Sequence, residues 1–206
     1  MINGIIGRVT GDAVSRFVIA IGQAIFLVLF LILYGDCIAA RQRIGAVYFF
    51  SRISNRKKWI LKEFVWLLFY SVLYTFCFVG MHMIFSIWGS SEANLSGTLF
   101  KVAFQIGLFL TLLLFEMAVL CNLFCAAGGS AIGILLSMLC VIGLIMWSTA
   151  EVDGVVSEMI NPMWLSADII ENGGSYIQKI IIVFLQMAIC AVGTGYYLAK
   201  RDLFAR

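Results

Sequence analysis

The chain has 206 residues, of which 63% are hydrophobic and 12% charged, and its formal net charge is +3. Soluble globular domains contain about 45 to 50% apolar and about 25% charged residues, so this composition excludes an ordinary soluble domain. The apolar residues form long runs between short polar stretches, which is typical of a multi-span membrane protein. The cysteines lie within these runs or at their ends, which argues against a secreted disulfide framework.

Residues 1–16 are predicted to form an interfacial segment. Within residues 2–16, Ile2, Ile5, Ile6 and Val9 recur at helical spacing with polar residues between them. Such a pattern favours a short amphipathic helix that lies flat on the membrane surface. We therefore expect an anchor here rather than a separate domain.

Five later stretches are predicted to cross the membrane. A spanning helix needs about 20 mostly apolar residues to cross about 30 Å of hydrocarbon. The stretches that meet this requirement are residues 17–35, 64–88, 100–125, 131–148 and 177–198. The sequence thus predicts an all-α integral membrane protein with five transmembrane helices in a single domain, residues 1–206. An odd number of spans places the two termini on opposite sides.

Lys and Arg predict the orientation of these spans, because cytoplasmic loops are enriched in both residues. Most of them lie in residues 36–62 or in the C-terminal tail, whereas residues 149–176 carry acidic residues and neither Lys nor Arg. We therefore expect the C-terminus in the cytoplasm, and the N-terminus and the segment 149–176 outside. Asn161 as N-cap, Pro162 at the first helical position and Gly173 beyond the end predict a short helix in this outer segment.

The predicted cytoplasmic loop, residues 36–62, carries the most informative pattern. It contains Arg41-Gln42-Arg43-Ile44-Gly45, then Ser51-Arg52-Ile53-Ser54-Asn55-Arg56-Lys57-Lys58-Trp59, and finally Lys62. This loop resembles that of ABC type-2 permeases, in which a charged run and a Gly leave one helix and a short basic amphipathic segment enters the next. The Asn161-Pro162 segment and the tail from Tyr197 to Phe204, which includes Lys200, Arg201 and Asp202, are also similar to that family. The likeness extends from about residue 25 to the C-terminus.

The resemblance implies the membrane subunit of an ATP-driven exporter. In that family the loop includes the coupling helix that docks on a separate cytoplasmic ATPase, and two permease subunits, as a homodimer or heterodimer, form the translocation path. ATP and Mg would then be bound by the partner ATPase, so we expect no cofactor, no metal and no enzymatic activity on this chain. The residues that would form the ATPase-coupling loop are Arg41, Arg43, Gly45, Arg52, Arg56, Lys57, Lys58, Trp59 and Lys62.

The sequence also departs from the family's pattern. The family usually has six spans that start in the cytoplasm, an acidic residue just before the loop's Gly, and a Pro before its Ser-Arg. Here there are five spans, Arg43 precedes the Gly, and Arg52 or Ile53 stands where Pro is expected. The absent span is the family's first. Either residues 1–16 are its surface remnant, or a partner supplies that helix.

Polar side chains inside the spans suggest a possible substrate path. These residues are Gln23, His82, Gln105, Gln186 and Glu116. At a rise of 1.5 Å per residue, Glu116 lies deep in its span, whereas the other four lie at a similar depth near the outer surface. The alternative is that they form hydrogen bonds that hold the helices together. We expect Glu116 to pair with a polar group of a neighbouring helix or to be protonated, because a lone ionised carboxylate is costly in hydrocarbon.

Small residues at every fourth position predict two helix-packing seams, within the bundle or between two copies. One is Gly129, Gly133 and Ser137, and the other is Ala191, Gly195 and Ala199.

Cys121 and Cys125 share a helical face, but no His or second Cys pair stands near them, so we expect no metal site. The chain has no phosphate-binding loop and no hydrolase motif.

Three interpretations follow from these features. The first is an exporter subunit in a bacterial cell membrane, with a hydrophobic or amphipathic cargo such as a peptide and no nucleic-acid partner. The second is a non-transporting scaffold or assembly protein whose basic loop binds anionic membrane lipid, since such a loop also serves as an orientation signal. The third, an intramembrane enzyme that uses His82 and Glu116, is disfavoured because these residues lie at different depths.

Overall fold

The computed structural model describes residues 13–45, 56–89, 97–149 and 176–200. The described part of the chain is helical and contains no strand, and five of its stretches are long and apolar enough to cross a membrane. The predicted all-α class is therefore confirmed for the described residues, and their five long apolar helices agree in number with the predicted spans of a multi-pass membrane protein. The helices are α1 (Ala13–Tyr34), α2 (Cys37–Gly45), α3 (Arg56–Gly89), α4 (Gly97–Gly128), α5 (Ser130–Thr149) and α8 (Tyr176–Lys200).

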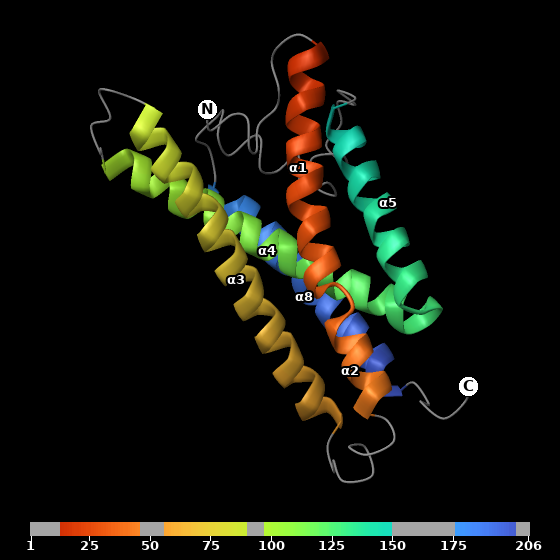
Figure 1. Cartoon of the computed structure of the whole chain (residues 1–206). Coiled ribbons are helices and arrows are strands. Elements are labelled where there is room, and N and C mark those ends of the chain that lie inside the picture. The colour runs from red at the N-terminus through yellow and green to blue at the C-terminus, as the bar shows by residue number, and fades with distance from the viewer. Residues whose placement is uncertain (1–12, 46–55, 90–96, 150–175, 201–206) are drawn as a thin grey trace.

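The central helix of the bundle is α4. It packs against α5, α8 and α3, and also against α1 and α2, and Figure 1 shows it running obliquely from the end of α3 to the start of α5. In its apolar stretch 67% of the residues are buried, against 11% in that of α8. Phe109, Leu113, Leu114 and Val119 of α4 form the middle of the hydrophobic core.

A break at Gly35 and Asp36 separates α1 from α2. A Cβ atom at position 35 would lie 2.7 Å from the Sγ of Cys121 and would overlap the backbone oxygen of Leu31, so only glycine allows α1 to end this close to α4. The chain then restarts as a helix, and the N–H of Ala40 donates to the carbonyl of Asp36 at 2.7 Å. Hydropathy marks only the apolar span, so it does not predict the bounds of this short helix within the loop 36–62.

The helix α3 is considerably longer than a membrane span. Its 34 residues extend about 51 Å at 1.5 Å per residue, against about 30 Å of hydrocarbon. The predicted span begins at residue 64, whereas α3 begins at Arg56, because Arg, Lys, Leu and Glu favour helix without raising the local hydropathy. The exposed Lys57 and Lys62 lie on these first turns.

Other predicted boundaries differ from the structure or lie outside the described residues. The helix α1 begins at Ala13 rather than at residue 17, so residues 13–16 of the predicted interfacial segment belong to it. The rest of that segment and the predicted helix of residues 161–173 lie outside the described part of the chain. The side of the membrane on which each terminus lies stays a prediction.

The predicted seam of Gly129, Gly133 and Ser137 lies where α4 meets α5. Gly129 forms the turn with a φ of +96°, which an L side chain rarely adopts. A Cβ at Gly133 would lie 2.5 Å from the Cα and Sγ of Cys125, so α5 starts in backbone contact with α4. The hydroxyl of Ser137 donates to the carbonyl of Gly133 at 2.8 Å. These small residues therefore pack two consecutive helices of one chain.

The second predicted seam also faces a helix of the same chain. A Cβ at Gly195 of α8 would lie 3.4 Å from the Cε2 of Phe64 and 3.9 Å from the Cγ2 of Ile60, both on α3. Ala191 and Ala199 are partly buried and pack against the core. The small residues of α8 thus line its contact with the rest of the bundle.

Candidate functional site at the basic end of the bundle

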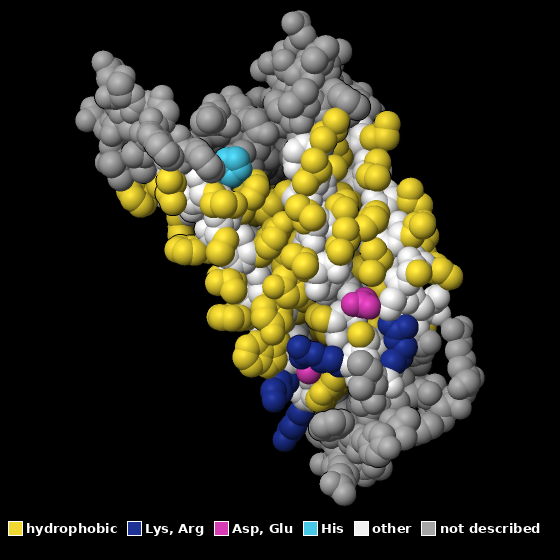
Figure 2. Space-filling model, viewed as in Figure 1, with side chains coloured by type: hydrophobic (Ala, Val, Ile, Leu, Met, Phe, Trp, Pro, Cys, Tyr) yellow, Lys and Arg dark blue, Asp and Glu magenta, His cyan; other side chains and the backbone are white. Residues whose placement is uncertain are grey.

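One end of the bundle carries most of the described Lys and Arg side chains. At this end α2 follows α1, α3 and α5 begin, and α4 and α8 end (Figure 1). Figure 2 shows cationic side chains gathered there, far from the histidine. We call it the basic end and define it by Arg41, Arg43, Arg56, Lys57, Lys58, Lys62 and Lys200.

An ion pair joins α2 to α3 at the basic end. The Nη1 of Arg41 lies 2.5 Å from the Oε2 of Glu63 and donates a hydrogen bond to it. The glutamate side chain is 8% exposed and the arginine side chain 47% exposed. Because the carboxylate is buried, it depends on the guanidinium to offset its loss of hydration. Arg41 therefore holds α2 against α3.

A second polar contact joins α2 to α5 and to the turn before α2. The Nη2 of Arg43 donates to the Oγ of Ser130, the first residue of α5, and lies 3.9 Å from the Oδ2 of Asp36. The hydroxyl of Ser130 in turn donates to the Oδ2 of Asp36 at 2.8 Å. The Nε of Arg43 donates to the carbonyl of Ala39 at 3.3 Å, which keeps the guanidinium along α2.

A third contact joins α2 to the central helix. The Oδ1 of Asn122 in α4 accepts hydrogen bonds from the backbone N–H groups of Ile38, at 2.9 Å, and Ala39, at 3.1 Å. N–H groups in the first turn of a helix have no acceptor within that helix. The Nδ2 of Asn122 donates to the carbonyl of Ala118 at 2.8 Å, which orients the fully buried amide. Asn122 thus caps α2 from another helix.

Sequence reasoning did not identify the four partner residues that hold α2: Asp36, Glu63, Asn122 and Ser130. Weak signals were present, because Asp36 and Ser130 each follow a glycine at a turn, and Asn122 is an amide within an apolar run. Their partners are distant in sequence, so no local pattern indicates the contacts. Together the four residues fix α2 to three helices by polar side chains.

The predicted coupling residues differ in how accessible they are. Lys57, Lys58 and Lys62 are exposed, whereas Trp59 is partly buried and packs against the hydrophobic core. Gly45 ends α2, and Arg52 lies outside the described residues. A partner that approaches the basic end would therefore meet the lysines rather than the indole.

The predicted path residues have diverse neighbours. His82 of α3 packs edge-on against Phe78, with ring centroids 4.5 Å apart. The Oε1 of Glu116 in α4 accepts a hydrogen bond from the Sγ of Cys190 in α8 at 3.8 Å. The Oε2 of Glu116 is buried without a hydrogen-bond partner among the described residues. Sequence reasoning identified Glu116 but not the thiol beside it.

The remaining path residues are Gln105 and Gln186, which are half-buried on α4 and α8. The side chain of Gln23 lies outside the described part of the structure.

The Sγ atoms of Cys121 and Cys125 lie 3.9 Å apart at the junction of α4 with α5. Within the described residues, no group of three or more His, Cys, Asp and Glu side chains is placed to hold a metal ion.

Comparison with known proteins finds no relative of this chain. No protein-family model, no curated protein and no solved structure matches the chain. The contacts of α2 and the charge of the basic end are therefore the basis for assigning a function.

Proposed function

We propose that this chain is the membrane subunit of an ATP-driven, ABC-type exporter that couples to separate ATPase subunits through α2 and the first turns of α3. The observation that carries the proposal is the attachment of one short helix at the basic end to α3, α4 and α5 at once. A partner that displaced α2 would pull on three long helices through Glu63, Asn122 and Ser130.

The strength of these attachments supports a mechanical role. Hydrogen bonds to charged groups contribute roughly 1.5 to 3 kcal/mol each, and neutral ones roughly 0.5 to 1.5 kcal/mol. The contacts of Arg41, Arg43 and Asn122 therefore total several kcal/mol, well above thermal energy, even after allowance for the exposed part of each arginine. We expect α2 to move together with the long helices rather than independently of them.

The charge of the basic end defines the partner surface. Lys57, Lys58 and Lys62 are exposed there, so an acidic surface on the ATPase would be complementary and would accelerate its association. The cargo is proposed to be hydrophobic or amphipathic, such as a peptide, because the spanning surfaces of the bundle are almost uncharged. A second permease subunit would complete the path.

A second candidate function rests on the same lysines. Lys57 and Lys58 extend beyond the apolar part of α3 and could bind anionic headgroups, at about 1 kcal/mol for each cation near the surface. The chain would then be a membrane scaffold or assembly protein without transport. The two functions differ in whether an ATPase associates with the protein.

Copurification tests the proposal. The full-length tagged protein is solubilised in mild detergent from its own membrane, and the associated proteins are identified by mass spectrometry. We expect an ATPase subunit with the wild type and its loss from the double variant Lys57→Glu and Lys62→Glu. Trp59 stays unchanged, because it packs against the core and its replacement would disturb folding.

The control is Gln178→Glu, which introduces a negative charge at an exposed residue in the first turn of α8, at the opposite end of the bundle. This variant should retain the ATPase. Absence of any ATPase from the wild type would contradict the exporter function. Retention of the ATPase by the double variant would contradict docking at the basic end.

A further inference from the structure

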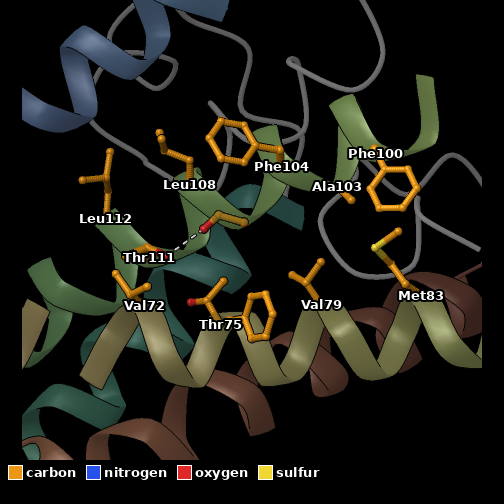
Figure 3. Close-up of a pocket in the computed structure, with 12 residues that line it drawn as sticks. Val72, Thr75, Val79, Met83, Phe100, Ala103, Phe104, Leu108, Thr111 and Leu112 are labelled. Atoms are coloured by element: carbon orange, nitrogen blue, oxygen red, sulfur yellow. Dashed lines mark hydrogen bonds between the residues drawn. The ribbon is translucent and has the colours of Figure 1, made fainter. Parts of the chain in front are cut away.

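A lateral groove lies between α3 and α4 in the half of the bundle away from the basic end. Its volume is about 490 Å³, within the range of roughly 300 to 1,000 Å³ for small-molecule sites. Its lining is mostly apolar. Figure 3 shows Val79 and Met83 of α3 directed toward α4, and Phe104 and Leu108 of α4 on the side of that helix turned away from α3, at the edge of the groove. A ligand of this groove must therefore be mainly hydrocarbon.

The length of the groove matches one leaflet of a bilayer. Its lining runs from Val72 to Met83 on α3, about 16 Å at 1.5 Å per residue, which is half of about 30 Å of hydrocarbon. On α4 the lining runs in the opposite chain direction, from Leu112 to Phe100. A single extended acyl chain has the shape that fills such a groove.

The groove has a floor that a glycine keeps open. A Cβ added to Gly107 would lie 3.9 Å from the Cγ2 of Thr75 and 4.0 Å from the Cγ2 of Val79, in ordinary contact with α3. The hydroxyl of Thr111 is satisfied by the carbonyl of Gly107 at 2.8 Å, as the dashed line in Figure 3 marks. A larger side chain at position 107 would project into the groove.

A cation lies near the end of the groove that is farther from the basic end. Lys101 is exposed and directly follows Phe100, at the interfacial end of the lining. It precedes Phe104 by three residues and Leu108 by seven, so helical spacing places it beside these two residues at the edge of the groove. A lysine at this depth extends its ammonium group into the headgroup region. The groove thus offers hydrocarbon along its length and a positive charge where a phosphate would lie.

We propose that this groove binds one acyl chain of an anionic phospholipid from the leaflet opposite the basic end, with the lipid phosphate held by Lys101. The volume favours a lipid over a helix of a second copy. A helix about 10 Å wide and about 16 Å long occupies roughly 1,250 Å³, more than twice the volume of the groove. This inference is independent of the transport function proposed above.

Photocrosslinking in liposomes tests the proposal. The full-length protein is reconstituted with either phosphatidylglycerol or phosphatidylcholine that carries a photoreactive group on one acyl chain, and adducts are mapped by mass spectrometry. A group near the chain end should label the region of Val72 and Leu112, and a group near the headgroup should label that of Met83 and Phe100. The yield with phosphatidylglycerol should be about fivefold higher, because its headgroup has a net negative charge that one nearby cation attracts, whereas the phosphate of phosphatidylcholine is neutralised by its own choline.

Two variants test the two parts of the site separately. Gly107→Leu should abolish labelling within the groove, and Lys101→Gln, a surface change that leaves the helix contacts intact, should make the yields with the two lipids equal. The matched control is Gly143→Leu, because a Cβ on that exposed glycine of α5 meets no atom within 4 Å. It should leave the labelling of the groove unchanged.

Three outcomes would overturn the proposal. One is labelling of the exposed faces of α5 and α8 as strongly as the groove, which would indicate unselective contact with bulk lipid. Another is an equal yield from both lipids in the wild type. The third is a crosslink between two copies of the chain at Phe104, which would assign the groove to a subunit interface.

Discussion

The carboxylate of Glu63 lies 2.5 Å from the guanidinium of Arg41, and the two partners differ in exposure, 8% for the glutamate side chain and 47% for the arginine side chain. The consequences of losing each partner therefore differ. Removing the arginine leaves a buried carboxylate without its counter-ion, whereas removing the carboxylate leaves an arginine that water can solvate.

We expect Arg41→Gln to lower the free energy of unfolding by about 2 kcal/mol, between the values for exposed and for fully buried pairs. Glu63→Gln should cost less, and the double variant should cost less than the sum of the two. Reversible unfolding in detergent measures these values as a double-mutant cycle. Lys62→Gln, at an exposed neighbour on α3, is the control and should have little effect. A coupling energy of zero would contradict a structural role for the pair.

Asn122→Leu should release the start of α2, because two first-turn N–H groups lose their acceptor. A lost cap costs about 0.5 to 2 kcal/mol, and the backbone amides of Ile38 and Ala39 should exchange with solvent faster. Hydrogen exchange followed by mass spectrometry measures this. In an exporter, the variant should still bind its ATPase but lose the stimulation of ATP hydrolysis by cargo.

The control for this prediction is Ser71→Ala. Ser71 is also fully buried, but its hydroxyl donates at 3.0 Å to the carbonyl of Leu67 within its own helix. This change should leave the exchange of α2 as in the wild type. If Asn122→Leu and Ser71→Ala gave the same exchange pattern, the cap would have no role in holding α2.

Two glycines of α5 form a matched pair. A Cβ at Gly133 would overlap the backbone of Cys125, whereas a Cβ at Gly143 would meet nothing within 4 Å. Gly133→Ala should therefore destabilise the protein by about 1 to 3 kcal/mol through overpacking, and Gly143→Ala should leave its stability unchanged or slightly higher. Thermal unfolding in detergent distinguishes the two. Equal effects would show that α5 does not approach α4 as closely as described.

Glu116 offers a contrast with Glu63, since one of its carboxylate oxygens is buried without a hydrogen-bond partner among the described residues. A carboxyl group in such a place is costly. Glu116→Gln keeps an acceptor for the thiol of Cys190 and removes the ionisable group, so we expect a melting temperature equal to or above that of the wild type. A loss of more than about 1 kcal/mol would indicate that the charge of Glu116 has a partner beyond the described residues.

The long helices of the bundle could be predicted from the sequence, because a span is a local property of about 20 consecutive residues. The contacts of α2 could not, because they join residues far apart in the chain. Asn122 and Ile38 are separated by 84 positions, and Arg43 and Ser130 by 87. Only the packing of α2 against α4, with α5 beginning beside it at Ser130, brings these side chains together.

Within the candidate site, too, the sequence indicates a cluster of residues but not their partners. A run of cations marked the basic end correctly as a cluster, but net charge along the chain does not reveal which cation is neutralised by a buried partner. Arg41 has such a partner in Glu63, whereas Lys57 and Lys62 remain exposed. The small residues likewise indicate close helix packing, but not whether the partner helix belongs to the same chain or to a second copy. The contacts of Gly133 with Cys125 and of Gly195 with Phe64 show that the partner belongs to the same chain.

The cap on α2 also sets an order for biogenesis. Ile38 leaves the ribosome 84 residues ahead of the asparagine that caps it, a delay of roughly 4 to 17 s at 5 to 20 residues per second. During that interval α1 is available for insertion while the first N–H groups of α2 lack this acceptor. The helix that α4 holds in the finished protein therefore lacks this acceptor until α4 has been synthesised, and nascent chains that end before Asn122 leave its first turn uncapped.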